Sequence, residues 1–147
     1  MEVGVVVDRG GQALYWHLPP GRCHTGLPDS RALWEVLWER RTELGGFAHS
    51  HPGRGEPCPS ALDRSTFAAI EAALGRRLDW WITSEDTLGL FRFDEQLGAH
   101  AAVGFGPVIG GVNPSAGAIA SLYAFEGEPS WLSALRRRST EEEEING

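Results

Sequence analysis

The sequence has no lysine, only two cysteines and no long apolar run. All 13 basic residues are therefore arginine, so no lysine amine is available for modification. The cysteines, Cys23 and Cys58, are too few for a disulfide framework and form no Cys-x-x-Cys motif. A reduced thiol is the default prediction for Cys58, while an approach to a metal or a pairing with Cys23 stays open.

Signals for a membrane or a nucleic acid are also missing. No stretch approaches the roughly 20 apolar residues of a membrane helix, and the N-terminus lacks a basic segment followed by an apolar signal core. The net charge is −7, and residues 141–144 are all glutamate, whereas a nucleic-acid partner would require a basic face. We therefore expect a cytoplasmic, soluble protein that has neither a membrane nor a nucleic-acid partner.

The length of 147 residues, with 41% hydrophobic residues and six tryptophans, suits one domain with one core. We expect this domain to span residues 1–138. The acidic tail, residues 139–147, cannot bury apolar surface and is expected to be disordered.

Hydrophobic periodicity and turn residues predict helices that alternate with strands up to residue 94. This alternation predicts an α/β fold, a mixed α+β arrangement in which a central mixed β-sheet is flanked by helices. The expected strands are 2–7, 12–18, 46–51, 78–84 and 88–93, with a glycine turn at 8–11, a helix from Asp29 or Ser30 to Gly45, and a helix from Ser60 to Gly75. Beyond them we expect a mobile loop at 104–111, a strand at 118–125 and a helix at 130–138.

The most informative motif is His49-Ser50-His51-Pro52, followed by a loop and then by Ser60-Ala61-Leu62-Asp63 at a helix start. Side chains alternate across a strand, so His49 and His51 project to the same side and Ser50 faces away. An aspartate in the first turn of the next helix can reach back across the loop. Three protein ligands are typical of a catalytic zinc site rather than a structural one, so the motif favours hydrolysis.

Each part of the motif also has a simpler interpretation. Ser60-x-x-Asp63 before an apolar helix is a capping box, and a solitary histidine is more often a surface residue than a ligand. The order of the parts, with two histidines ending a strand and a capping box opening the next helix, favours the metal site over a capped helix beside two unrelated histidines.

These residues resemble the signature of the JAMM (MPN+) zinc metallopeptidases, and the chain looks like a small, stand-alone member of the prokaryotic type. The similarity covers roughly residues 2–94, and residues 46–48 and 78–84 look like the strands that flank the family's site. The loop between His51 and Ser60 is one residue longer than the family's usual spacing. The resemblance implies an MPN/JAB-like architecture, which is similar to that of the cytidine deaminases.

The resemblance also implies a role for each site residue. His49, His51 and Asp63 would bind one Zn²⁺ per chain, and Ser60 would donate a hydrogen bond to the oxyanion. Glu2, before the apolar run that follows it, would be the general base. The family has a helix in front of this glutamate, so here either the first strand or a partner chain near the N-terminus would have to anchor it. Glu56 is a weaker candidate for the base, and the helical acids Glu35, Glu39 and Glu43 are more typical of a solvated face.

The function implied by the resemblance is a zinc-dependent isopeptidase or peptidase, similar to a deubiquitinase. Its substrate would be the C-terminal tail of a ubiquitin-like or sulfur-carrier protein. One alternative is a non-catalytic MPN-type scaffold, which would not need the complete His-His-Asp set. A second alternative is a nucleobase deaminase, but that chemistry requires His-x-Glu and Pro-Cys-x-x-Cys, and neither is present.

Overall fold

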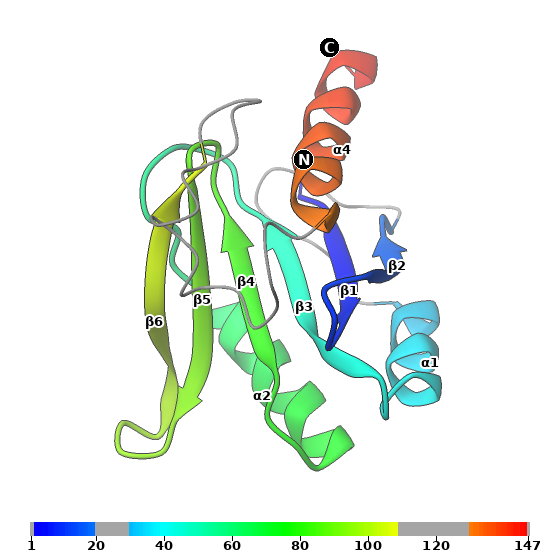
Figure 1. Cartoon of the computed structure of the whole chain (residues 1–147), viewed down its shortest axis with the longest axis vertical. Helices are drawn as coiled ribbons and strands as arrows, with labels where there is room; N and C mark the ends of the chain where they lie inside the picture. The colour runs from blue at the N-terminus through cyan, green and yellow to red at the C-terminus, as the bar shows by residue number, and fades with distance from the viewer. Residues whose placement is uncertain (1, 20–29, 109–129, 147) are drawn as a thin grey trace.

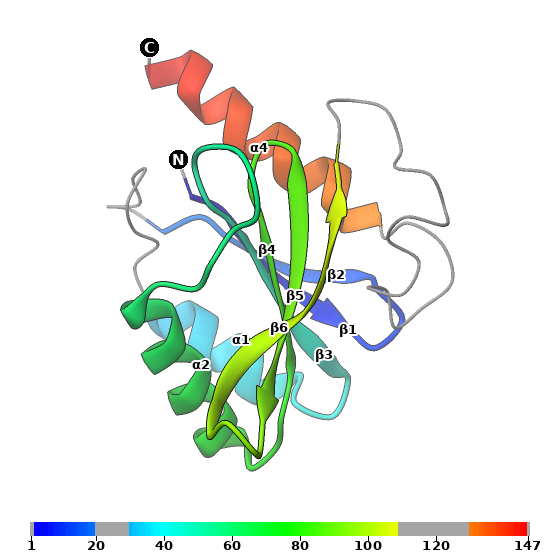
Figure 2. The same ribbon diagram turned by 90° about the vertical axis from the view of Figure 1, so that its left-hand side faces the viewer.

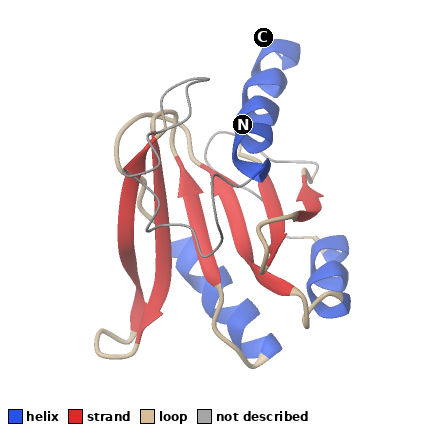
Figure 3. Ribbon diagram, in the orientation of Figure 1, coloured by secondary structure: helices blue, strands red, loops and turns tan. Residues whose placement is uncertain are grey.

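The computed structural model describes residues 2–19, 30–108 and 130–146, and in this part of the chain six strands form one mixed sheet flanked by three helices (Figures 1 and 3). The strand order is β2-β1-β3-β4-β5-β6. The expected α/β class, with a central mixed sheet between helices, is confirmed. The elements are β1 (Gly4–Asp8), β2 (Ala13–His17), α1 (Arg31–Glu39), β3 (Leu44–Ser50), α2 (Ala61–Leu74), β4 (Asp79–Thr83), β5 (Thr87–Asp94), β6 (Ala99–Pro107) and α4 (Ser130–Asn146).

Strands β3 and β4 are parallel neighbours, and every other pair in the sheet is antiparallel. A parallel pair needs a crossover connection, and helix α2 provides it (Figure 1). The loop that leaves β3 therefore leads directly to the first turn of α2. This connection brings the end of β3 and the start of α2 to the same edge of the sheet.

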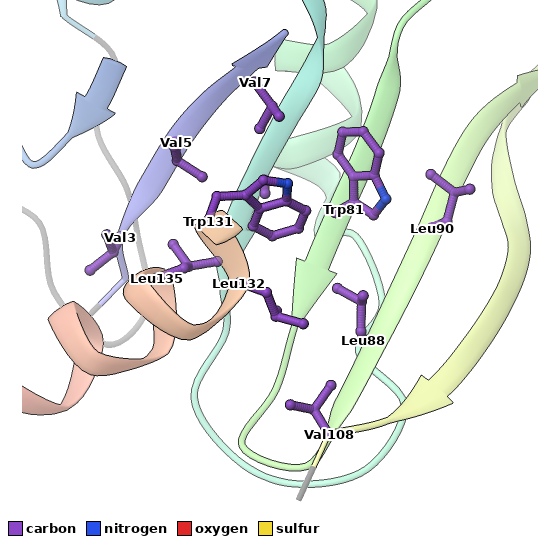
Figure 4. Close-up of a cluster of buried hydrophobic side chains, with 11 residues drawn as sticks. Val3, Val5, Val7, Trp81, Leu88, Leu90, Val108, Trp131, Leu132 and Leu135 are labelled. Atoms are coloured by element: carbon purple, nitrogen blue, oxygen red, sulfur yellow. The ribbon is translucent and has the colours of Figure 1, made fainter. Parts of the chain in front are cut away.

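The two faces of the sheet carry separate apolar clusters, because side chains alternate along each strand. Helices α1 and α2 cover one face and α4 covers the other (Figure 2). The neighbours Trp80 and Trp81 point to opposite faces, with Trp80 against α2 and Trp81 against α4. Figure 4 shows the α4 side, which consists of Val3, Val5, Val7, Ala48, Trp81, Leu88, Leu90, Val108, Trp131, Leu132 and Leu135.

The predicted hairpin at the N-terminus is confirmed. The Asp8 carboxylate accepts hydrogen bonds from the backbone N–H groups of Gly10 and Gln12, at 2.9 and 2.8 Å. Gly11 has a φ of 84°, which a residue with a side chain rarely adopts. The turn residues thus account for the antiparallel pairing of β1 with β2.

Helix α1 begins as predicted but ends earlier. The Ser30 hydroxyl caps it by accepting a hydrogen bond from the Leu33 N–H, and the helix ends at Glu39 rather than Gly45. The prediction treated Gly45 as a helix stop, whereas both glycines of Gly45-Gly46 lie in β3. A Cβ on Gly46 would lie 1.9 Å from the Asp79 carbonyl oxygen, so glycine is required where β3 approaches β4.

The loop prediction for residues 104–111 is wrong for its first half, because β6 continues through Pro107. Gly104 and Gly106 pair with Leu90 and Leu88 of β5. Between them, the Phe105 ring lies against Gly89, where a Cβ would be 2.9 Å from the ring. Gly104 and Gly106 thus belong to a paired strand rather than to a loop, and the close approach of the Phe105 ring is allowed by Gly89 of β5. The remainder of the predicted loop lies outside the described residues, as does the predicted strand at 118–125.

Helix α4 begins at Ser130, as expected, but extends to Asn146 instead of ending near Arg138. Its first turns are held by Trp131, Leu132 and Leu135, which are buried against the sheet. The segment 139–146, expected to be disordered, continues this helix. Within the described ranges, no helix is both long and apolar enough to cross a membrane.

Candidate metal centre

Two histidines converge where β3 ends. His49 and His51 are two residues apart on an extended segment, and their Nε2 atoms lie 3.0 Å from each other. His49 is only 3% exposed and packs against the edge of the Phe67 ring from α2. His51 lies just after the strand, and its backbone N–H donates to the Thr83 carbonyl at 2.8 Å. The period of the strand therefore places both imidazoles on the α2 side of the sheet, as predicted.

Asp63 joins this pair from the first turn of α2. One carboxylate oxygen lies 3.0 Å from the His51 Nε2, and the other lies 3.3 Å from the His49 Nε2. The capping box is also present, because the Ser60 N–H donates to Asp63 at 2.9 Å and the Asp63 N–H donates to the Ser60 hydroxyl at 3.0 Å. The cap and the ligand position are thus compatible, since the cap fixes the carboxylate in the orientation that faces the histidines.

Ser60 is exposed at the N-cap of α2. Its hydroxyl oxygen accepts the Asp63 N–H, which leaves the hydroxyl proton available for donation. The role of Ser60 as an oxyanion donor therefore stays a prediction.

The loop between the histidines and α2 is tied to the turn between β4 and β5. The Gly55 N–H donates to the Asp86 carboxylate at 2.7 Å, and the Ser84 hydroxyl donates to the Gly55 carbonyl at 2.7 Å. The Glu85 N–H donates to the Gly53 carbonyl at 2.9 Å. Two glycines of this loop have positive φ, at 93° for Gly53 and 90° for Gly55, so the backbone turns at these positions.

Glu2 reaches the same cluster from the N-terminal end of the chain. Its carboxylate oxygen lies 3.8 Å from the His51 Nε2, and the residue is 7% exposed. Burial raises the pKa of Glu2 to about 7, an effect that His51 opposes and the negative charge of Asp63 reinforces. A carboxyl group with a pKa near neutrality can both accept and release a proton at the pH of the cell.

Burial and hydrogen bonding shift the pKa values of two candidate ligands, His49 and Asp63. Burial lowers the pKa of His49, which favours the neutral imidazole. Burial alone would raise the pKa of Asp63, but the hydrogen bonds with His49 and His51 outweigh it and lower that pKa well below its usual range. A neutral imidazole and an ionised carboxylate are the forms that bind metal.

The donor set fits a metal ion. His49, His51 and Asp63 each offer one ligand atom, and these atoms lie within 4.8 Å of one another. Two imidazole nitrogens and one carboxylate suit zinc in an open site, and the same set also suits ferrous iron. The structure therefore supports a metal site, while the choice of zinc rests on the sequence motif.

The other acids weighed for the base do not join this cluster. Glu56 is exposed in the motif loop, and Glu35 and Glu39 are exposed on α1. Glu43 is exposed in the turn after α1, where it pairs with Arg40. Cys58 is an exposed free thiol outside the metal-binding group, and Cys23 lies outside the described residues. Among the acids considered as the general base, Glu2 is thus the one that the fold brings to the histidines.

The sequence did not predict the burial of several polar groups, among them Ser50 and the Glu71–His100 pair. Ser50, between the ligands, accepts a hydrogen bond from the Val3 N–H. Glu71 of α2 is 2% exposed and binds His100 of β6 at 2.7 Å. Glu71 follows the buried Phe67 by four residues and therefore shares its helix face, which is a sequence signal for burial.

Comparisons with models of known protein families and with curated protein sequences give no match to this chain. The similarity to the JAMM metallopeptidases therefore rests on the motif residues alone.

The metal-free protein is expected to lose stability as the pH rises, because of Glu2. Its pKa is about 7 in the folded state and 4.5 as the reference value, so folding favours the protonated form. The contribution is present below pH 4.5 and is lost by about pH 7, on the order of 3 kcal/mol at 1.36 kcal/mol per pKa unit. Urea unfolding with a chelator should show that Glu2→Gln removes this part of the pH dependence.

Glu56→Gln is the matched control, since it removes one exposed carboxylate near the same site. If wild type and Glu2→Gln have parallel pH profiles between pH 4.5 and 8, Glu2 is not desolvated in the folded protein.

Proposed function

We propose that this protein is a zinc-dependent peptidase or isopeptidase of the JAMM type, a hydrolase that cleaves at the C-terminal tail of a ubiquitin-like or sulfur-carrier protein. One observation carries the proposal: a buried carboxylate with a raised pKa, Glu2, lies beside a His-His-Asp cluster that could bind a metal. A structural metal site would not need such an acid, whereas hydrolysis does.

The residues divide the chemistry among them. His49, His51 and Asp63 would hold the ion. A bound zinc ion would lower the pKa of water to about 7 and polarise the substrate carbonyl. Glu2 would accept the proton of the attacking water at its carboxylate oxygen and deliver it to the leaving amine. Ser60 would donate its hydroxyl proton to the oxyanion.

The alternatives receive less support. A nucleobase deaminase would need cysteine ligands, but Cys58 is exposed and outside the metal-binding group, whose third member is Asp63. A non-catalytic scaffold would gain nothing from burying Glu2 at a cost in stability.

The test combines metal analysis with a cleavage assay. Purified protein should contain about one zinc per chain, and saturating zinc at 100 times its Kd should raise the free energy of unfolding of the stripped protein by about 2.7 kcal/mol. A ubiquitin-like protein fused at its C-terminus to a reporter should be cleaved, and a chelator should stop the cleavage. His49→Ala and His51→Ala should lose zinc and cleavage together.

Cys58→Ser is the control for these variants, because it changes the motif loop without removing a proposed ligand. It should keep both zinc and cleavage. Cleavage that survives the chelator, selective binding of ferrous iron, or unchanged zinc in both histidine variants would contradict the proposal.

A further inference from the structure

The segment that carries Glu2 is joined to β3 by one hydrogen-bonded pair beyond the end of β1. The Ser50 N–H donates to the Val3 carbonyl at 3.0 Å. In return, the Val3 N–H donates to the hydroxyl oxygen of the Ser50 side chain at 2.9 Å. In a regular antiparallel pair the two residues exchange both bonds through their backbones. Here the Ser50 hydroxyl accepts the bond that a backbone carbonyl would otherwise accept.

The register of the sheet gives this pair its importance. Gly4 pairs with His49 in the antiparallel β1–β3 ladder. One step further, Val3 lies opposite Ser50, and the next step places Glu2 opposite His51. This agrees with the 3.8 Å between the Glu2 carboxylate and the His51 Nε2. The bond to Ser50 is therefore the last attachment before the general base.

This attachment is protected from water. Val3 is fully buried among the side chains that face α4, and Ser50 is 5% exposed. Ser50 points away from the metal ligands, to the opposite face of the sheet, so it can hold the N-terminal segment without approaching the ion.

We propose that Ser50 is a positioning residue that holds Glu2 against the metal centre by closing this last pair with Val3. The catalytic consequence rests on the proposed peptidase function, but the structural consequence does not. The Ser50 hydroxyl thereby extends the pairing of the first strand to Glu2, which is one of the two means of anchoring that the sequence left open.

The structural test measures amide hydrogen exchange at Val3 in the metal-free protein. Ser50→Ala removes the acceptor and should speed exchange at Val3 by about tenfold, while Ser50→Thr keeps a hydroxyl and should restore protection. Ser50→Cys replaces the hydroxyl by a thiol, which is a weak acceptor of similar size. This variant is measured in the same way if the alanine variant does not fold.

Thr83→Val is the matched control. Thr83 pairs with Ser50 across β3 and β4, is 2% exposed, and donates its hydroxyl locally to the Ser84 carbonyl at 2.9 Å. Its replacement removes an equally buried hydroxyl and should leave exchange at Val3 unchanged. If Ser50→Ala and Ser50→Cys leave Val3 as protected as in wild type, or if Thr83→Val has the same effect as they do, the proposal is overturned.

The kinetic test asks whether Ser50 acts through Glu2. Ser50→Ala should lower kcat by up to about 100-fold with an unchanged KM and one zinc per chain, and Ser50→Thr should recover most of it. In a Glu2→Gln background the same change should have no further effect on kcat. Zinc loss that parallels the loss of kcat, or additive effects in the double variant, would overturn the proposal.

The two tests separate the positioning role from the proposed function. If the wild-type protein cleaves none of the substrates but Ser50→Ala still releases Val3, the peptidase proposal fails and the attachment of Glu2 by Ser50 stands. If the wild type cleaves and exchange at Val3 does not change, the positioning role fails alone.

Discussion

Replacing Glu2 with glutamine is expected to lower turnover by about 10²–10⁴-fold while one metal ion per chain stays bound, because a general base typically contributes that factor. Glutamine is nearly the same size as glutamate but cannot accept the proton of water. The ligand atoms of His49, His51 and Asp63 lie within 4.8 Å of one another without any contribution from Glu2. The loss should therefore fall on kcat, with KM nearly unchanged.

The measurement compares kcat, KM and zinc content of Glu2→Gln with those of Glu2→Asp and Glu56→Gln. Glu2→Asp keeps a carboxylate but shortens its reach, so part of the activity should remain. Glu56→Gln tests the weaker candidate in the exposed motif loop and should cleave at the wild-type rate. A Glu2→Gln protein that cleaves as fast as wild type would assign the base to another residue.

Replacing Glu71 with alanine is expected to lower the free energy of unfolding by about 3–5 kcal/mol, the cost of removing one partner from a buried polar network. One carboxylate oxygen of Glu71 accepts from His100 at 2.7 Å and from Arg77 at 3.1 Å. The other accepts from the Leu78 N–H at 2.8 Å and from the Trp80 indole at 3.0 Å. Alanine would leave the buried donors of His100, Leu78 and Trp80 without their acceptor, whereas the half-exposed Arg77 can donate to water instead.

The Glu71 network also contacts the candidate metal site indirectly, through packed aromatic rings. Trp80 stacks on Phe67 with ring centroids 4.2 Å apart, and the edge of Phe67 packs on His49. Glu71 therefore fixes the position of Trp80, and Trp80 packs against Phe67 of α2. Loosening α2 would also loosen Asp63, which lies on the same face of that helix.

Urea unfolding of stripped protein at one pH measures the effect. Glu39→Ala, which removes an exposed helical glutamate from α1, is the control and should change stability by no more than about 0.5 kcal/mol. Trp80→Phe removes one donor and keeps the aromatic stacking, so it should cost about 1 kcal/mol. A Glu71→Ala protein as stable as the Glu39→Ala control would mean that the network contributes little to the fold.

The turns and helix starts could be predicted because their signals are local. Asp8 and Gly11 form the predicted hairpin turn, and Ser30 caps α1. A single glycine is a weaker signal for a helix end or a loop than a turn or cap motif is. Gly45 is interpreted as a helix end and Gly104 as part of a loop, although both lie in strands, whereas the strand prediction for Gly46 is confirmed. A Cβ on Gly45 would lie 2.6 Å from the Asp8 carbonyl oxygen of the neighbouring strand. Such an approach depends on a strand that is distant in sequence, and no local pattern contains it.

The ligand pattern follows from local sequence. His49 and His51 share a face because of the strand period, and the capping box directs Asp63 because a first-turn residue must lie beside its cap. The other contacts arise from packing between distant elements: Glu2 reaches His51 through the register of β1 on β3, and Glu71 meets His100 across 29 residues. Both contacts depend on how separate elements pair and pack, so their geometry is set by the whole sheet rather than by neighbouring residues.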